Sequence, residues 1–192
     1  MELLERAIAY TRGSLALVRA DLMAAPTPCA GWDLHALLLH MHDSLASLDE
    51  AGSARVVHRA TPPAPPVDLV DSLRVRACRL LAEWSTDWAA DPRAARSAPA
   101  GSLDILVDGR PVTSSVLTSA GALEIAVHGW DVAVACGDNR PLPDELAADL
   151  LLLAPVLVTA VDRPTRFAAA RPSRPGCSPG ERLLAFLGRA PR

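Results

Sequence analysis

Glu124 and His128 lie four positions apart in the apolar segment GALEIAVHGWDVAVACG, residues 121–137, whose composition favours a buried helix. Side chains with this spacing share one face of a helix, so the carboxylate and the imidazole can address one point. Burying either group alone is costly, because desolvation disfavours its charged form. We therefore expect a hydrogen-bond partner or a metal ion beside this pair.

A third ligand has to come from another helix, and His40 is the best candidate. It lies midway along an apolar helical segment, one turn from Leu37, so its side chain can face the core. His35 lies near the start of that helix and His58 lies in a proline-rich stretch. His42 is rotated by about 200° from His40, at ~100° per residue, and should face away from it.

His40, Glu124 and His128 together supply three nitrogen and oxygen ligands and leave one coordination position open, as in a catalytic rather than a structural zinc site. Asp131 lies one turn beyond His128, and we expect it to support that ligand or cap a group rather than bind the metal directly. Spacing alone leaves a second interpretation open. Each histidine can be a hydrogen-bonded core residue, and the glutamate can face solvent.

The composition indicates one globular domain over residues 1–192. The chain is 50% hydrophobic with a net charge of -3, which suits a full hydrophobic core. The apolar run from Leu150 to Val161 is too short to span a bilayer and contains Pro155, and the N-terminus lacks the pattern of a signal peptide. We predict a cytoplasmic protein without a membrane partner.

Charge and cysteine usage exclude several classes of protein. All 19 basic residues are arginines scattered among 22 acidic residues, so no nucleic-acid-binding surface is expected. The cysteines form no CxxC pair, which argues against a zinc ribbon or a disulfide framework: Cys29, Cys78, Cys136 and Cys177. We interpret them as small reduced hydrophobic residues away from the ligands, so any thiol chemistry requires an external thiol.

Apolar periodicity predicts four long helices. The first carries a stripe from Leu4 to Leu22, and the second begins with Asp33 as a cap. The third covers about residues 68–88 and the fourth residues 115–137. An extended, proline-rich linker is expected at about residues 53–67.

Three smaller elements complete the prediction. Residues 103–113 alternate around Asp108 and Gly109, as in a tight β-hairpin. A fifth helix begins at Pro143 and bends or stops near Pro155. A covering segment at about 163–192 contains a helix that starts with a capping box from Ser178 to Glu181.

Three stretches resemble a known family. PTPCAGWDLHALLLHM (residues 26–41) and ALEIAVHGWDVAVACG (122–137) resemble the mycothiol-dependent maleylpyruvate isomerase family within the DinB-like superfamily. RLLAFLGR (182–189) is similar to the C-terminus of an uncharacterised metal-binding subfamily of this length. The resemblance implies an all-α, up-and-down four-helix bundle with a divalent metal, usually zinc, held by His40, Glu124 and His128. Another divalent metal such as nickel is the alternative.

The resemblance also implies a function. Mycothiol bound to the metal becomes a thiolate that adds to a small electrophilic substrate, giving isomerisation or S-transfer. Arg110 and Arg140 are candidates to clamp a substrate carboxylate. Two alternatives remain: a hydrolase that uses metal-bound water, and a non-catalytic module that binds a metal or small molecule. The expected partners are the thiol and a small molecule, and the protein is expected to be a monomer or homodimer.

Burial of Glu124 for a metal predicts strain in the metal-free protein, where the carboxylate would lack compensation. Glu124→Leu is then expected to stabilise the metal-free protein by about 1 to 2 kcal/mol while removing metal affinity. If Glu124 instead belongs to a structural hydrogen-bond network, Glu124→Leu is expected to destabilise the metal-free protein.

Overall fold

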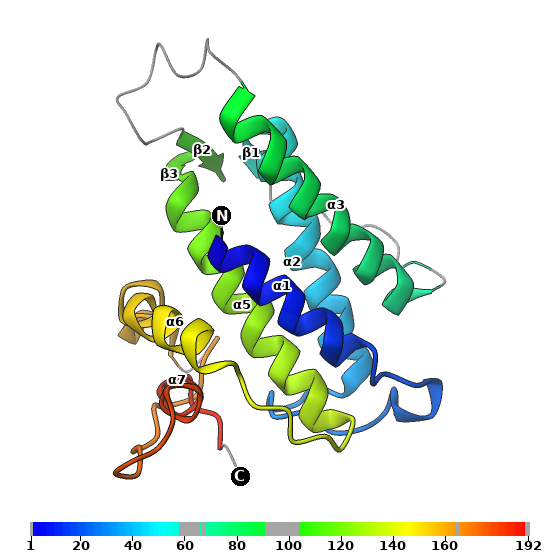
Figure 1. Ribbon diagram of the computed structural model, residues 1–192, viewed down its shortest axis with the longest axis vertical. Helices are drawn as coiled ribbons and strands as arrows, with labels where there is room; N and C mark the ends of the chain where they lie inside the picture. Colours follow the sequence, from blue (N-terminus) through cyan, green and yellow to red (C-terminus); the bar gives the residue numbers. More distant parts are fainter. Residues whose placement is uncertain (1, 58–65, 67, 91–103, 164–165, 191–192) are drawn as a thin grey trace.

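The computed structural model (Figure 1) describes residues 2–57, 66, 68–90, 104–163 and 166–190. Four long helices form a bundle: α1 (Glu2–Leu15), α2 (Leu34–Ala54), α3 (Leu69–Ala90) and α5 (Ser114–Ala135). α1 packs along α5, and α2 packs against both α3 and α5. The predicted all-α class is therefore confirmed.

The direction of α3 departs from the alternation expected of an up-and-down bundle. Arg74, near the start of α3, donates from Nη2 to the backbone oxygen of Leu15 at the end of α1, at 3.1 Å. In Figure 1, α2 and α3 run in the same direction, and α1 and α5 run in the opposite one. The chain between Ala54 and Leu69 is long enough for this, since an extended chain spans ~3.3 Å per residue and a helix only ~1.5 Å.

The predicted caps fix where two helices begin. The Asp33 side chain accepts from the backbone N–H of Ala36 at 2.8 Å and caps α2. At α7 (Pro179–Phe186), Ser178 and Glu181 exchange side-chain and backbone hydrogen bonds as the predicted capping box. These caps orient the two segments that flank the site, α2 and the C-terminal segment.

α1 ends earlier than its apolar stripe predicts. The helix stops at Leu15, and a 3-10 turn, η1 (Ala20–Leu22), follows. Val18 and Leu22 nevertheless pack against the core. The periodic spacing therefore predicted correctly that these side chains pack against the core, but not that they lie in a helix, because a turn can also direct them into the core.

α1 and α5 approach closely at Gly129. Thr11 donates from Oγ1 to the backbone oxygen of Ile125 at 2.8 Å, within the core. A Cβ atom at Gly129 would collide with Thr11 Oγ1 and would lie 3.2 Å from its Cα. Glycine at 129 therefore permits the helix contact beside His128.

A small sheet closes one end of the bundle. β2 (Asp104–Val107) and β3 (Arg110–Thr113) form the predicted antiparallel hairpin, and the turn residues Asp108 and Gly109 both have positive φ, 49° and 76°. β1 (Val56–Val57), which was not predicted, adds to β2 in parallel. The rest of the predicted linker lies mostly outside the described residues.

The C-terminal part covers the other end of α5. α6 (Asp144–Leu157) starts directly after Pro143 and continues through Pro155 for two further residues. The turn η2 (Ala160–Asp162) follows, and α7 packs on α6. None of the helices in the described part of the chain combines the length and the hydropathy that a membrane span requires.

Candidate metal centre

His40, Glu124 and His128 meet where α2 crosses α5. One ligand atom from each residue lies within 4.8 Å of the other two. Nε2 of His40 is 2.5 Å from Oε1 of Glu124, and Nε2 of His128 is 3.2 Å from the same oxygen. The three side chains predicted from the sequence therefore converge on one point.

The Glu124 carboxylate has partners in the absence of a metal. Besides both imidazoles, the Ser44 hydroxyl donates to Oε1 at 3.3 Å. Burial by itself raises the pKa of Glu124, but the charge of His128 and the hydrogen bonds from His128 and His40 hold that pKa well below its usual value. The expectation that a metal-free Glu124 lacks compensation is therefore wrong.

Asp131 fixes the orientation of the His128 ring. Its Oδ2 atom accepts from Nδ1 of His128 at 2.9 Å, and its side chain is fully buried. Burial lowers the pKa of His128, but the Glu124 charge and the hydrogen bond to Asp131 raise it well above its usual value. Because Nδ1 is engaged by Asp131, Nε2 is the nitrogen directed at Glu124. Asp131 thus lies where a supporting carboxylate is expected.

Cys29 lies beside these residues, contrary to the sequence prediction that no cysteine is near them. Its Sγ atom is 3.2 Å from Oδ2 of Asp131 and 3.8 Å from Nδ1 of His128. The thiol precedes α2 by only a few residues, and the loop before α2 brings it to the far side of the His128 ring. Cys29, His128 and Asp131 form a second group of donor atoms within 4.8 Å.

The two donor groups use opposite nitrogens of His128. The first group meets at Nε2, whereas the second meets at Nδ1, where Asp131 also contacts Arg189. Metal-binding histidines commonly donate their other ring N–H to a carboxylate, and this is the relation between Nδ1 and Asp131. The donor chemistry therefore fits a divalent metal at His40, Glu124 and His128 better than at the Cys29 group.

Arg189 is a component of the site that sequence reasoning missed. It follows α7, and Nη2 of its guanidinium lies 2.8 Å from Oδ2 of Asp131 and 3.5 Å from Sγ of Cys29. Both Arg189 and Asp131 are buried. The sequence signal was present, since Arg189 ends the RLLAFLGR stretch, but nothing in its spacing connects it with α5.

A pocket of about 670 Å³ opens onto the three donors. Much of its wall is apolar, formed by Trp32, Leu123, Leu157, Val158, Phe167 and Leu187. The Trp32 ring stacks at a tilt on His40, with centroids 4.8 Å apart. The polar wall comprises Cys29, His40, Glu124, His128, Arg166 and Arg189. The donors are therefore reachable by a small molecule from one side.

The two arginines proposed as substrate clamps do not line this pocket. Arg140 lies over the Tyr10 ring, 5.1 Å from its centroid, and its backbone oxygen accepts from the Tyr10 hydroxyl at 2.9 Å. Arg110 is exposed at the start of β3, at the sheet end of the bundle. Arg166 and Arg189 take their place in the pocket wall. His42 is buried and belongs to neither donor group.

Comparison with known proteins places the chain in a family. A family model described as the mycothiol maleylpyruvate isomerase N-terminal domain matches residues 4–133. The chain belongs to this family. The family resemblance drawn from the sequence is confirmed. Membership suggests a mycothiol-related, metal-binding protein, and His40, Glu124 and His128 form a possible metal site. The matched segment contains His40, Glu124, His128 and Asp131, whereas Arg189 lies beyond it.

Relatives of this mycothiol maleylpyruvate isomerase family member occur in Mycobacterium tuberculosis. The chain is 31% identical over 181 residues to the uncharacterized protein Rv0738 of strain H37Rv, covering 93% of this chain and 91% of that protein. It is 32% identical over 140 residues to the uncharacterized protein Rv0036c, covering 66% of this chain and 52% of the relative. No solved structure matches the chain.

Proposed function

We propose that the protein is a metal-dependent enzyme that activates a low-molecular-weight thiol, mycothiol, for addition to or transfer onto a small electrophilic substrate. The observation that carries this proposal is the convergence of His40, Glu124 and His128 at the wall of a pocket, in a chain of the mycothiol maleylpyruvate isomerase family. We propose these three side chains as the ligands of one divalent ion, zinc or alternatively nickel.

Zinc held by these residues would lower the pKa of a coordinated thiol and supply a thiolate at neutral pH. Glu124 keeps a negative charge beside both imidazoles, because its pKa lies well below the usual value. Asp131 holds the proton on Nδ1 of His128 and so directs Nε2 toward Glu124. These residues organise the donors, and none of them needs to act as the nucleophile.

The pocket wall supports binding of an organic molecule beside the donors. Trp32 and Phe167 provide aromatic surfaces on which the apolar part of an organic molecule can pack. Arg166 adds a positive charge to the pocket wall. Its side chain is largely exposed, and its Nη1 atom lies 3.6 Å from Oδ1 of Asp162. Cys29 faces Nδ1 of His128 rather than Nε2, so we assign the reacting thiol to an external molecule. A cytoplasmic location and a monomeric or homodimeric state stay predictions.

Cobalt substitution tests the proposal. The Co²⁺-loaded protein is titrated with mycothiol, and we expect a thiolate-to-cobalt charge-transfer band that saturates with the thiol. The matched control is His40→Ala, which removes one proposed ligand but leaves Cys29 in place. If the wild-type spectrum does not respond to thiols while the protein hydrolyses an ester or amide, the protein is a hydrolase that uses metal-bound water, and the thiol-activating function is wrong. Absence of any cobalt uptake contradicts both enzymatic functions.

A further inference from the structure

The C-terminal segment places a buried cation beside the candidate metal centre. Arg189 meets Asp131 through two nitrogens, with Nη2 2.8 Å from Oδ2 and Nε 3.4 Å from Oδ1. The side chains are 9% and 0% exposed. A buried ion pair often contributes no more to stability than well-packed apolar residues do, because both charges lose their hydration. Stability alone therefore does not account for this pair.

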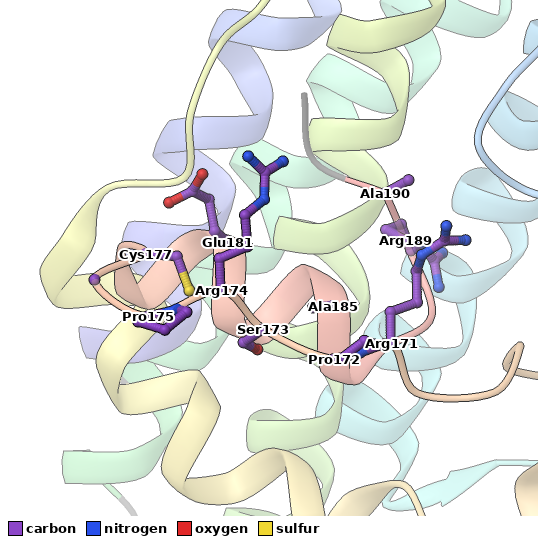
Figure 2. Close-up of a pocket in the computed structure, with 11 residues that line it drawn as sticks. Arg171, Pro172, Ser173, Arg174, Pro175, Cys177, Glu181, Ala185, Arg189 and Ala190 are labelled. Carbon is purple, nitrogen blue, oxygen red and sulfur yellow. The ribbon is translucent and has the colours of Figure 1, made fainter.

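The backbone around Arg189 aims its side chain at α5. The N–H of Arg189 donates to the backbone oxygen of Leu184 at 2.8 Å, and Gly188 has a φ of 83°. This left-handed residue ends α7 and turns the chain back toward the bundle. Nη1 of Arg189 also donates to the backbone oxygen of Leu187 at 3.1 Å. Figure 2 shows Arg189 just past the last turn of α7.

Arg189 is linked to His128 through Asp131. Oδ2 of Asp131 is shared by Nη2 of Arg189 and Nδ1 of His128, at 2.8 and 2.9 Å. The carboxylate therefore cannot turn toward another partner without breaking a charged contact. With Nδ1 fixed in this way, Nε2 of His128 stays 3.2 Å from Glu124. The chain of contacts runs from the C-terminal segment to the proposed ligands.

We propose, resting on the metal-dependent function above, that Arg189 is a positioning residue of the metal centre. It holds Asp131 on Nδ1 of His128 and thereby commits Nε2 of that ring to the His40 and Glu124 side. Arg189 also engages the Asp131 carboxylate, which a metal bound by Cys29, His128 and Asp131 would need as a ligand. The C-terminal segment, which lies outside the matched family segment, thus completes the site.

The test compares Arg189→Met with Arg163→Met in the full-length protein. Arg163 belongs to the same C-terminal part and also supports it, since Nη2 donates to the backbone oxygen of Phe186 at 2.7 Å and the guanidinium lies 5.0 Å from that ring. Zinc affinity is measured by competition with a chromophoric chelator. We expect Arg189→Met to lower it by about 10- to 100-fold, the range for losing such support, and Arg163→Met to stay within about twofold of wild type.

Cobalt spectra separate positioning from general stability. At saturating Co²⁺ we expect the ligand-field bands of Arg189→Met to differ from those of wild type, while those of Arg163→Met coincide with them. Arg189→Lys keeps a charge near Asp131 but loses the two-nitrogen contact, so its zinc affinity should lie between wild type and Arg189→Met. If Arg189→Met does not fold, the zinc affinity of Arg189→Lys still tests the proposal.

Two outcomes overturn the proposal in distinguishable ways. If wild type binds zinc, and Arg189→Met or Arg189→Lys binds it with unchanged affinity and an unchanged cobalt spectrum, Arg189 is only structural and the proposed function stands. If wild type takes up neither zinc nor cobalt, the proposed function fails, and the positioning role fails with it.

Discussion

Nε2 of His40 lies 2.5 Å from Oε1 of Glu124, although the two residues are 84 positions apart and belong to different helices. The contact places an imidazole from α2 on the carboxylate that His128 also meets from within α5. Two nitrogens and one oxygen thus face one another at the pocket wall. This arrangement leads to the first prediction.

Protein purified without chelator should contain about one divalent ion per chain, as measured by elemental analysis. His40→Ala should reduce this metal content strongly, because it removes one of the three proposed ligands. The fold should tolerate the substitution, since His40 is half-exposed and its loss opens no core cavity. His35→Ala is the matched control, since His35 is an exposed histidine near the start of the same helix. Equal metal content in the two variants would remove His40 from the site.

Cys29→Ser distinguishes the two overlapping donor groups. Because Asp131 is already engaged by Arg189 and His128, we expect the metal at His40, Glu124 and His128, and the serine variant should bind zinc within about twofold of wild type. Co²⁺-loaded wild type without added thiol should correspondingly lack a thiolate charge-transfer band. Loss of zinc from Cys29→Ser, or such a band in wild type, assigns the metal to the Cys29 group instead.

Gly129→Ala tests the contact that holds α1 on α5. The new Cβ would collide with Thr11 Oγ1, so we expect a loss of about 1 to 3 kcal/mol in unfolding free energy, typical of overpacking. Thr11→Ala in the same chain removes the colliding oxygen and should recover part of that loss in chemical denaturation. If Gly129→Ala is as stable as wild type, the helices have room to separate and the close approach is not required.

The sequence predicted those parts of the site that depend on local geometry. Glu124 and His128 follow from helical spacing, and His40 follows from its place one turn from a core leucine. The hairpin at Asp108 and Gly109 was predictable because two successive residues with positive φ favour this dipeptide. Each of these predictions needs only the few residues around it.

The parts that were missed depend on how distant segments meet. Cys29 reaches Nδ1 of His128 from a loop 99 positions away along the chain. Arg189 reaches Asp131 from the C-terminal segment, 58 positions away. Periodicity carries no information on such contacts. The direction of α3 was missed for a related reason, because a connection as long as the one before Leu69 permits either direction.

Glu124→Leu is the last prediction, and the structure reverses the sign expected from the sequence. Without a metal, Glu124 accepts hydrogen bonds from His40, His128 and Ser44, and the leucine would leave the buried Nε2 of His128 without its acceptor. An unsatisfied buried polar group costs about 1 to 3 kcal/mol, so the variant should melt below wild type in chelator. Zinc should raise the melting temperature of wild type, which binds it in the folded state, but should leave that of the variant unchanged.

Glu145→Leu, at an exposed position in the first turn of α6, controls for the added apolar side chain and should keep the full zinc response. Thermal melts of the three proteins in chelator and in zinc decide the matter: a Glu124→Leu protein that melts above wild type in chelator would show that the carboxylate is a liability which only a metal compensates.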